Sequence, residues 1–121
     1  MAAKFDFTGD AKAIQREATY SRVFTVTIGG ALANFAGYTA KMHVRTEISN
    51  EDTVIELTTE NNRITLGGSA GTITVSLTNL ETTELSPGSY VYDLFLISGS
   101  GESTRYYYGK FEVKESITRW L

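Results

Sequence analysis

The chain has 121 residues, of which 41% are hydrophobic and 21% are charged, and its formal net charge is −3. These values are typical of one folded domain and exclude a disordered chain. The absence of cysteine excludes disulfides, thiolate metal sites and a thiol nucleophile. We therefore expect a single domain over residues 1–121.

Two features of the sequence indicate the compartment and the possible partners. The N-terminal residues MAAKFDF lack the apolar run of a secretory signal, and no segment reaches the roughly 18 apolar residues of a membrane span. No stretch of Lys and Arg forms the basic stripe that phosphate binding needs. We expect a soluble protein made in the cytoplasm, with no membrane insertion and no nucleic-acid partner.

Short runs of Thr, Ser, Val, Ile and Tyr alternate with polar residues and are broken by turns rich in Gly, Asn and Ser. This pattern predicts an all-β protein, an immunoglobulin-like β-sandwich of about seven to eight strands. The predicted strands are Lys12–Gln15, Ser21–Ile28, Tyr38–Arg45, Thr53–Thr58, Arg63–Leu66, Thr72–Leu77, Ser89–Ile97 and Thr104–Val113. Their alternation predicts a core of Tyr20, Phe24, Val26, Met42, Val44, Leu57, Ile73, Val75, Tyr92, Leu94, Tyr107, Phe111 and Val113.

Residues 78–86, TNLETTELS, interrupt the strand rhythm. Thr78 and Glu81 have the spacing of a capping box, and Leu80 and Leu85 are apolar anchors for one or two helical turns. We expect a short helix near residues 78–86.

The residues after this helix predict a corner. Proline cannot continue a helix and glycine readily takes turn conformations, so Pro87 and Gly88 should end the helix. Tyr90 then begins a strand, in the position of the tyrosine corner of immunoglobulin-type sandwiches. We expect its ring to pack inside while its hydroxyl bonds to backbone near Pro87.

Few residues are candidates for chemistry. His43, the only histidine, alternates with Met42 and Val44 and should share a solvated face with Lys41 and Arg45. No GxSxG turn accompanies it, and no DxDxDG loop offers a calcium site. The glycine-rich stretch at 66–71 leads into a strand and is interpreted as a hairpin turn, not a phosphate cradle. We expect no enzymatic activity and no catalytic, cofactor-binding or metal residue.

The run RYYYGKF at 105–111 should divide between two faces of one strand. The apolar set, which we expect to face the core with the Arg105 stem at its edge, is Tyr107, Gly109, Phe111 and Val113. The other set is Tyr106, Tyr108, Lys110 and Glu112. Its mixture of aromatic and charged side chains is typical of a subunit-facing surface, although ordinary cross-strand packing on a solvated sheet is an equal alternative. Tyr106, Tyr108 and Lys110 are therefore candidate interaction residues.

The C-terminal residues 114–121 form a predicted tail beyond the sandwich. Ile117, Trp120 and Leu121 can form one apolar anchor for a neighbouring subunit, since tryptophan is enriched in binding hot spots. A solvated, polar tail is the alternative. Ile117, Trp120 and Leu121 complete the set of candidate interaction residues.

From residue 19 onward the order of segments resembles the phage baseplate upper-protein type of small tail-associated proteins. The segments that carry the resemblance most specifically are GYTAKMHVR at 37–45, ENNRITLGGSAGTI at 60–73 and LSPGSYVYDL at 85–94. The resemblance covers nearly the whole chain. It implies an immunoglobulin-like sandwich and a non-enzymatic structural protein of the virion, in the tail, baseplate, neck or fibre attachment.

As partners, the resemblance implies other phage structural proteins and symmetry-related copies of the chain, and as location the virion, after synthesis in the host cytoplasm. Two alternatives remain open. One is a head decoration (cement) protein, and the other is a receptor- or glycan-binding module that would place aromatic rings in a concave pocket.

Overall fold

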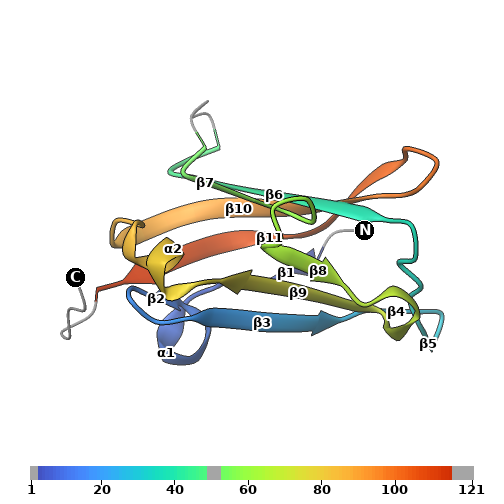
Figure 1. Cartoon of the computed structure of the whole chain (residues 1–121), viewed down its shortest axis with the longest axis horizontal. Coiled ribbons are helices and arrows are strands. Elements are labelled where there is room, and N and C mark those ends of the chain that lie inside the picture. Colours follow the sequence, from blue (N-terminus) through green and yellow to red (C-terminus); the bar gives the residue numbers. More distant parts are fainter. Residues whose placement is uncertain (1–2, 49–52, 116–121) are drawn as a thin grey trace.

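The computed structural model describes residues 3–48 and 53–115 and consists mainly of β-strands packed in two layers (Figure 1). The larger sheet has the strand order β1-β11-β10-β6-β7, with β2 also paired to β11, and the smaller sheet has the order β3-β9-β8. A separate hairpin is formed by β4 and β5. The all-β sandwich predicted from the alternating pattern is confirmed.

The elements in chain order are β1 (Ala3–Lys4), α1 (Gly9–Lys12), β2 (Ile14–Gln15), β3 (Tyr20–Thr25), β4 (Thr27–Ile28), β5 (Ala31–Leu32), β6 (Thr39–Arg45), β7 (Ile55–Thr58), β8 (Ile64–Leu66), the 3₁₀-helix η1 (Gly68–Ala70), β9 (Thr72–Leu77), α2 (Asn79–Thr83), β10 (Gly88–Ile97) and β11 (Ser103–Lys114). Seven of the described strands have three or more residues. The predicted strand Ser21–Ile28 is two strands, because the chain leaves the smaller sheet at Thr25 and enters the hairpin at Thr27. β11 extends to Lys114, the first residue of the predicted tail.

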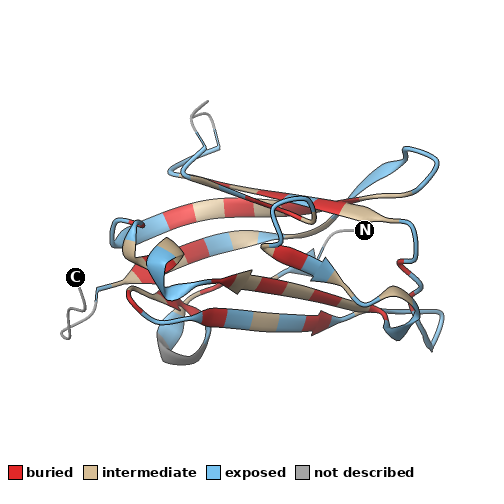
Figure 2. Ribbon diagram, viewed as in Figure 1, coloured by how far each residue is buried: buried red, intermediate tan, exposed pale blue. Residues whose placement is uncertain are grey.

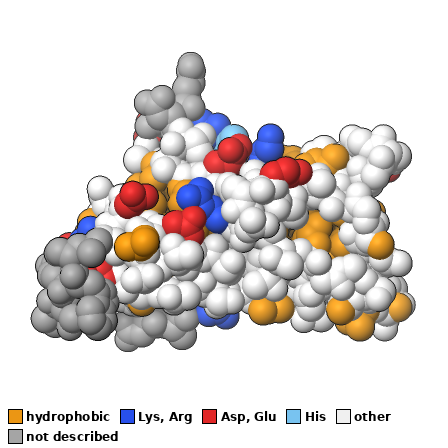
Figure 3. Space-filling model, viewed as in Figure 1, with side chains coloured by type: hydrophobic (Ala, Val, Ile, Leu, Met, Phe, Trp, Pro, Cys, Tyr) orange, Lys and Arg blue, Asp and Glu red, His pale blue; other side chains and the backbone are white. Residues whose placement is uncertain are grey.

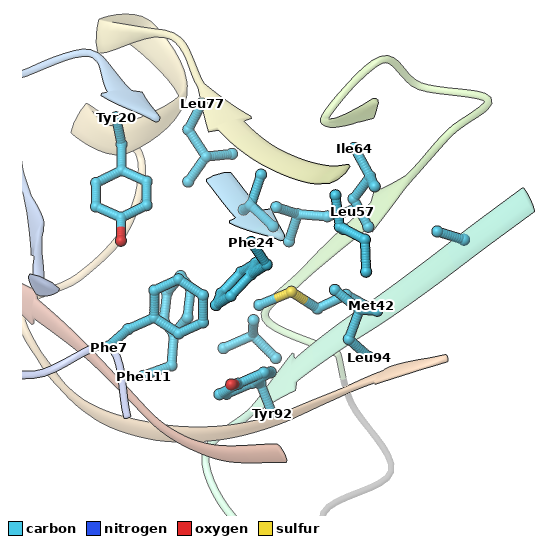
Figure 4. Packing of buried hydrophobic residues seen from close by; sticks show 14 of the residues in the cluster. Phe7, Tyr20, Phe24, Met42, Leu57, Ile64, Leu77, Tyr92, Leu94 and Phe111 are labelled. Carbon is cyan, nitrogen blue, oxygen red and sulfur yellow. The ribbon is translucent and has the colours of Figure 1, made fainter. Parts of the chain in front are cut away.

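The core lies between the inner faces of the two sheets. Buried and partly exposed residues alternate along β9 and β10, which appear as regular bands in Figure 2. Of the predicted core residues, all are buried except Val26 and Tyr107, which are partly buried and pack against the core. Figure 4 shows side chains from both layers meeting, with Met42 and Leu94 opposite Phe24 and Leu77. Each layer therefore buries one face of its strands against the other.

α2 begins as the sequence predicts. The hydroxyl of Thr78 accepts a hydrogen bond from the Glu81 backbone N–H, and the Glu81 carboxylate accepts one from the Thr78 N–H at 2.7 Å, which completes the capping box. Of the two expected anchors only Leu85 is buried, and Leu80 is 60% exposed. Thr82 takes the inward position instead, and its hydroxyl donates to the carbonyl of Ala18.

The tyrosine corner is also present. The Tyr90 ring is buried and its hydroxyl donates to the carbonyl oxygen of Ser86 at 2.6 Å. This bond ties the start of β10 to the segment that follows α2. The expected packing and bonding of Tyr90 are both confirmed.

A β-bulge interrupts the pairing of β10 with β11. Leu94 lies opposite Tyr107, but the next residue, Phe95, lies opposite Arg105, so Tyr106 is an extra residue on β11. The alternation of β11 therefore changes phase at this point, and Tyr106 and Tyr107 both reach the core. The prediction that Tyr106 lies on the outer face is wrong for this reason, as is the prediction that Arg105 shares a face with Tyr107.

The N-terminal segment, residues 3–15, runs parallel to β11 along the edge of the larger sheet (Figure 1). β1 pairs with Tyr107 and Tyr108, Phe7 bridges to Phe111, and β2 pairs with Val113 and Lys114. The sequence predicted only the last part of this arrangement as a strand.

Candidate functional site

The outer face of the larger sheet carries the most distinctive surface of the described residues. One cross-strand row runs over five strands, because the register places Lys4 beside Tyr108, Tyr108 beside Asp93, Asp93 beside His43, and His43 beside Glu56. Side chains that lie opposite each other on one face of a sheet are close enough to interact. The row therefore brings together residues from β1, β11, β10, β6 and β7.

The neighbouring rows add cations on both sides of Asp93. One row contains Lys110 of β11, Val91 of β10 and Arg45 of β6. On the other side, β11 contributes Arg105. Asp93 is therefore surrounded by basic side chains from three strands.

These residues line a depression of about 340 Å³ in the outer face. Its lining residues are Lys4, His43, Arg45, Ile48, Val91, Tyr92, Asp93, Arg105, Tyr108, Gly109 and Lys110. Four of them are Lys or Arg and one is Asp, so the depression carries a formal charge of +3 with His43 neutral, in a chain whose net charge is −3. The depression is thus a local concentration of positive charge on an acidic protein.

Tyr108 and Arg105 form the aromatic part of the depression. The Arg105 guanidinium lies over the Tyr108 ring, with its central carbon 4.8 Å from the ring centroid. Such a cation–π contact contributes about 0.5–1 kcal/mol at an exposed site and holds both side chains in place. Tyr108 nevertheless keeps 36% of its surface exposed. The pair forms an amphipathic, exposed part of the surface.

His43 is held by both of its ring nitrogens. Its Nε2 lies 2.8 Å from the Glu56 carboxylate, and its Nδ1 lies 3.2 Å from the Arg45 guanidinium. Arg45 can only donate, so the contacts fit the tautomer in which Nε2 carries the proton and Nδ1 accepts. In Figure 3 the imidazole lies among acidic and basic side chains at the upper edge of the molecule. The solvated face predicted for His43, with Lys41 and Arg45, is confirmed.

The candidate Tyr106 and the predicted core residue Tyr107 both face away from the depression. The Tyr106 ring meets Phe35 edge-on at 5.8 Å, and the Tyr107 ring stacks on Phe24 at 4.6 Å. Burial raises the pKa of the Tyr107 hydroxyl, and Tyr106 acts in the same direction. Both rings therefore serve the packing of the sandwich.

The structure brings some of the predicted interaction residues together and separates others. Tyr108 and Lys110 both line the depression, whereas Tyr106 packs against the core. Ile117, Trp120 and Leu121 lie outside the described residues. Sequence reasoning missed Lys4, Arg45, Arg105 and Asp93 as members of one surface, since only the register of β1, β6, β10 and β11 shows that they meet.

A second exposed surface lies on the β4–β5 hairpin and on β3 of the smaller sheet. Ile28 of β4 and Leu32 of β5, which lie in neighbouring cross-strand pairs of the hairpin, are 61% and 54% exposed, and Val23 on β3 is 56% exposed. Figure 3 shows hydrophobic side chains gathered at the lower right, where Figure 1 places this hairpin. No single run of the sequence singles out this group.

The chain matches no protein-family model, and no curated protein is significantly similar to it. Within residues 3–48 and 53–115, no three His, Asp or Glu side chains are grouped in a way that could hold a metal ion. No helix in the described part of the chain is long and apolar enough to cross a bilayer.

Proposed function

We propose that the protein is a non-enzymatic structural component of a phage virion, in the tail, baseplate, neck or fibre attachment, and that it acts through protein–protein contacts. The assignment to a phage virion rests on the resemblance of residues 19–119 to tail-associated proteins. The observation that carries the mode of action is the exposed Arg105–Tyr108 pair in a basic depression. Tyr and Arg are the residues most enriched at the centres of protein interfaces.

The positive charge of the depression indicates which chemical groups the partner presents. Four cations around a single carboxylate favour a partner surface that presents carboxylates, because opposite potentials steer the encounter and suppress wrong partners. Asp93 supplies an acceptor in the centre for a donor group on the same partner. An acidic loop or strand of a neighbouring virion subunit fits this arrangement.

Imaging tests the location. Particles are grown with a tagged copy of the chain, labelled through the tag and viewed by negative-stain electron microscopy. Label on the tail, baseplate or neck is the expected result. Label on the head would replace the tail assignment with head decoration, and particles without label would refute a virion role altogether.

Variants test the contact surface. Arg105→Ala and Tyr108→Ala each remove half of the exposed pair and should reduce incorporation into particles several-fold, since truncation of an interface hot spot costs about 2 kcal/mol or more. Ser21→Ala is the control, because Ser21 is exposed on β3 of the other sheet and belongs to neither exposed surface described above. Melting temperatures show whether each variant is folded. Equal incorporation of all three variants would contradict a role for this surface.

A glycan-binding module is the second candidate, and the same depression is the observation that favours it. Its volume of about 340 Å³ lies at the small end of ligand pockets, and it combines an aromatic ring with converging polar groups. The basic lining favours acidic sugars. Binding of acidic but not neutral oligosaccharides by titration calorimetry, lost in Tyr108→Ala, would favour this function over subunit contact.

A further inference from the structure

We propose that the N-terminal segment, residues 3–15, is an exchangeable strand that can insert into the sandwich of a second copy of the chain. The segment closes one side of the sandwich, because Phe5 and Phe7 pack between the two sheets. The Phe5 ring meets Phe24 of β3 at 4.9 Å, and the Phe7 ring meets Tyr92 of β10 at 5.0 Å. Phe7 is fully buried.

The body of the sandwich forms a receptor shaped to this segment. Backbone N–H groups of Phe5 and Phe7 donate to β11 carbonyls at 2.9 and 2.8 Å, and the Glu112 N–H donates back to Phe7 at 2.9 Å. The Tyr92 hydroxyl donates to the Phe5 carbonyl at 2.6 Å. Burial raises the pKa of this hydroxyl, with the Asp6 carboxylate acting in the same direction, so it stays a donor.

Gly109 provides the space for the segment. A Cβ at this position would clash with the Phe5 carbonyl oxygen and would lie 2.6 Å from Asp6 Oδ1. Without the segment, β11 would expose a long row of unpaired backbone groups beside an open aromatic core, which is a template for another strand. The strand that fits it in sequence, register and shape is residues 3–15 of any copy.

The connection to the body allows the exchange. Residues 16–19 link β2 to β3, and the link is closed by a turn in which the Ala18 N–H donates to Gln15. Glu17 lies within this turn at φ 68°, a conformation that costs a non-glycine residue on the order of 1 kcal/mol. Opening the link relieves that conformation, and four extended residues span about 14 Å. The contacts of residues 3–15 are remade in the second copy, which makes such exchange a low-cost route to assembly. Opening the link loses the bond that Arg16 donates to the Thr83 carbonyl and the bond that the Thr82 hydroxyl donates to the Ala18 carbonyl.

The protein concentration determines whether the closed monomer or the exchanged dimer forms. A short link holds the segment at an effective concentration in the millimolar range, so an isolated chain closes on itself at micromolar concentrations. Exchange becomes competitive when chains approach about 1 mM, or when copies are held side by side in an assembly.

Exchange also makes the basic depression a composite site. Lys4 lies on β1 and lines the depression beside Tyr108. In the exchanged form this lysine comes from the second copy. The inference does not depend on the function proposed for the depression.

A cysteine pair tests the exchange, because the chain has no cysteine of its own. Lys4→Cys with Tyr108→Cys joins the segment to its receptor, since the two residues are partners in register. The variant is unfolded, refolded at about 10 µM or about 1 mM, oxidised, and separated on a denaturing gel without reductant. We expect the ratio of covalent dimer to monomer to rise about 50-fold with this rise in concentration, by mass action against the effective concentration of the link.

The matched control is His43→Cys with Glu56→Cys, which joins partners on β6 and β7 within the body. It should give covalent monomer at both concentrations. Dimer in equal amounts in both variants, or in neither, would overturn the proposal.

The length of the link gives a second measurement, since short hinges favour swapping. Deleting residues 18–19 should raise the fraction of dimer on size exclusion, and inserting Gly-Ser-Gly after Ala18 should lower it. An unchanged fraction in both would also refute exchange.

Discussion

Gly109→Ala should destabilise the sandwich more than any ordinary glycine substitution. The added Cβ would clash with the Phe5 carbonyl oxygen and would lie 2.6 Å from Asp6 Oδ1, and real Cβ atoms essentially never show contacts this short. The segment has to shift away from β11 to admit the methyl group. Forcing atoms into a packed site costs about 1–3 kcal/mol, and the shift also weakens the hydrogen bond from the Tyr92 hydroxyl, worth about 0.5–1.5 kcal/mol.

The control is Gly101→Ala. Gly101 also has a positive φ, 93°, but a Cβ there would meet nothing within 4 Å. Both variants therefore carry the backbone cost of a positive φ, and both reduce the entropy of the unfolded chain. The difference between them measures the clash with the N-terminal segment.

We expect Gly109→Ala to lose about 2–4 kcal/mol more than Gly101→Ala in urea unfolding followed by far-ultraviolet circular dichroism. For a domain of this size each kcal/mol lowers the melting temperature by about 4 °C, so the two melts should differ by about 8 °C or more. Equal losses in the two variants would show that the segment does not press against Gly109. The packing of residues 3–15, and the receptor argued from it, would then be wrong.

Three further outcomes are expected. Tyr90→Phe removes the corner hydrogen bond and should cost about 0.5–1.5 kcal/mol in the same unfolding assay, and an unchanged midpoint would contradict the corner. Burial raises the pKa of the Glu81 carboxyl, but hydrogen bonds from Thr78 and Arg63 outweigh it and hold that pKa below its ordinary value of 4.5. The stability that Glu81 adds is therefore present above this value and is lost as the pH falls through the lower folded-state pKa. Glu81→Gln should have a lower melting temperature than wild type at about pH 7 and the same melting temperature as wild type at about pH 2. Lastly, a chain shortened to Arg119, without Trp120 and Leu121, should keep its melting temperature but enter particles several-fold less well, and equal incorporation would remove the docking role of these residues.

The parts of the fold that were predictable are those governed by local chemistry. The capping box of Thr78 and Glu81, the corner at Tyr90 and the alternation along β9 and β10 each depend on residues within a few positions of one another. Side-chain period and capping geometry determine such features with little help from the rest of the chain.

The parts that were missed depend on contacts between distant residues. The bulge that turns Tyr106 inward follows from the pairing of β10 with β11, and no residue of RYYYGKF signals it. The segment at residues 3–15 pairs with a strand about 100 positions away, as the bond between Lys110 and Asp6 illustrates, with a separation of 104. Two-residue strands such as β1 are too short for alternation to identify.

The same distinction between local and long-range contacts applies to the candidate site. Tyr108 and Lys110 were found because they share one strand face, which needs only the period of two. The charge of the depression needs four strands in register, since Lys4, Arg45 and Arg105 come from β1, β6 and β11, and β10 lies between β11 and β6. An even distribution of cations along the sequence is therefore compatible with a charged surface in the fold.

β1 is part of both the exchangeable segment and the basic depression, and the consequence can be measured. Lys4 belongs both to the exchangeable segment and to the row that crosses the depression. In the exchanged dimer the lysine of the second copy takes the same register beside Tyr108, so each depression is rebuilt with the same residues. A ligand shifts an equilibrium only by its difference in affinity for the two forms. An acidic probe peptide should therefore bind monomer and exchanged dimer with equal affinity per site and leave the dimer fraction unchanged. A several-fold difference in affinity between purified monomer and dimer would mean that exchange does not restore the register of β1, and that the depression in one chain is not the one present in an assembly.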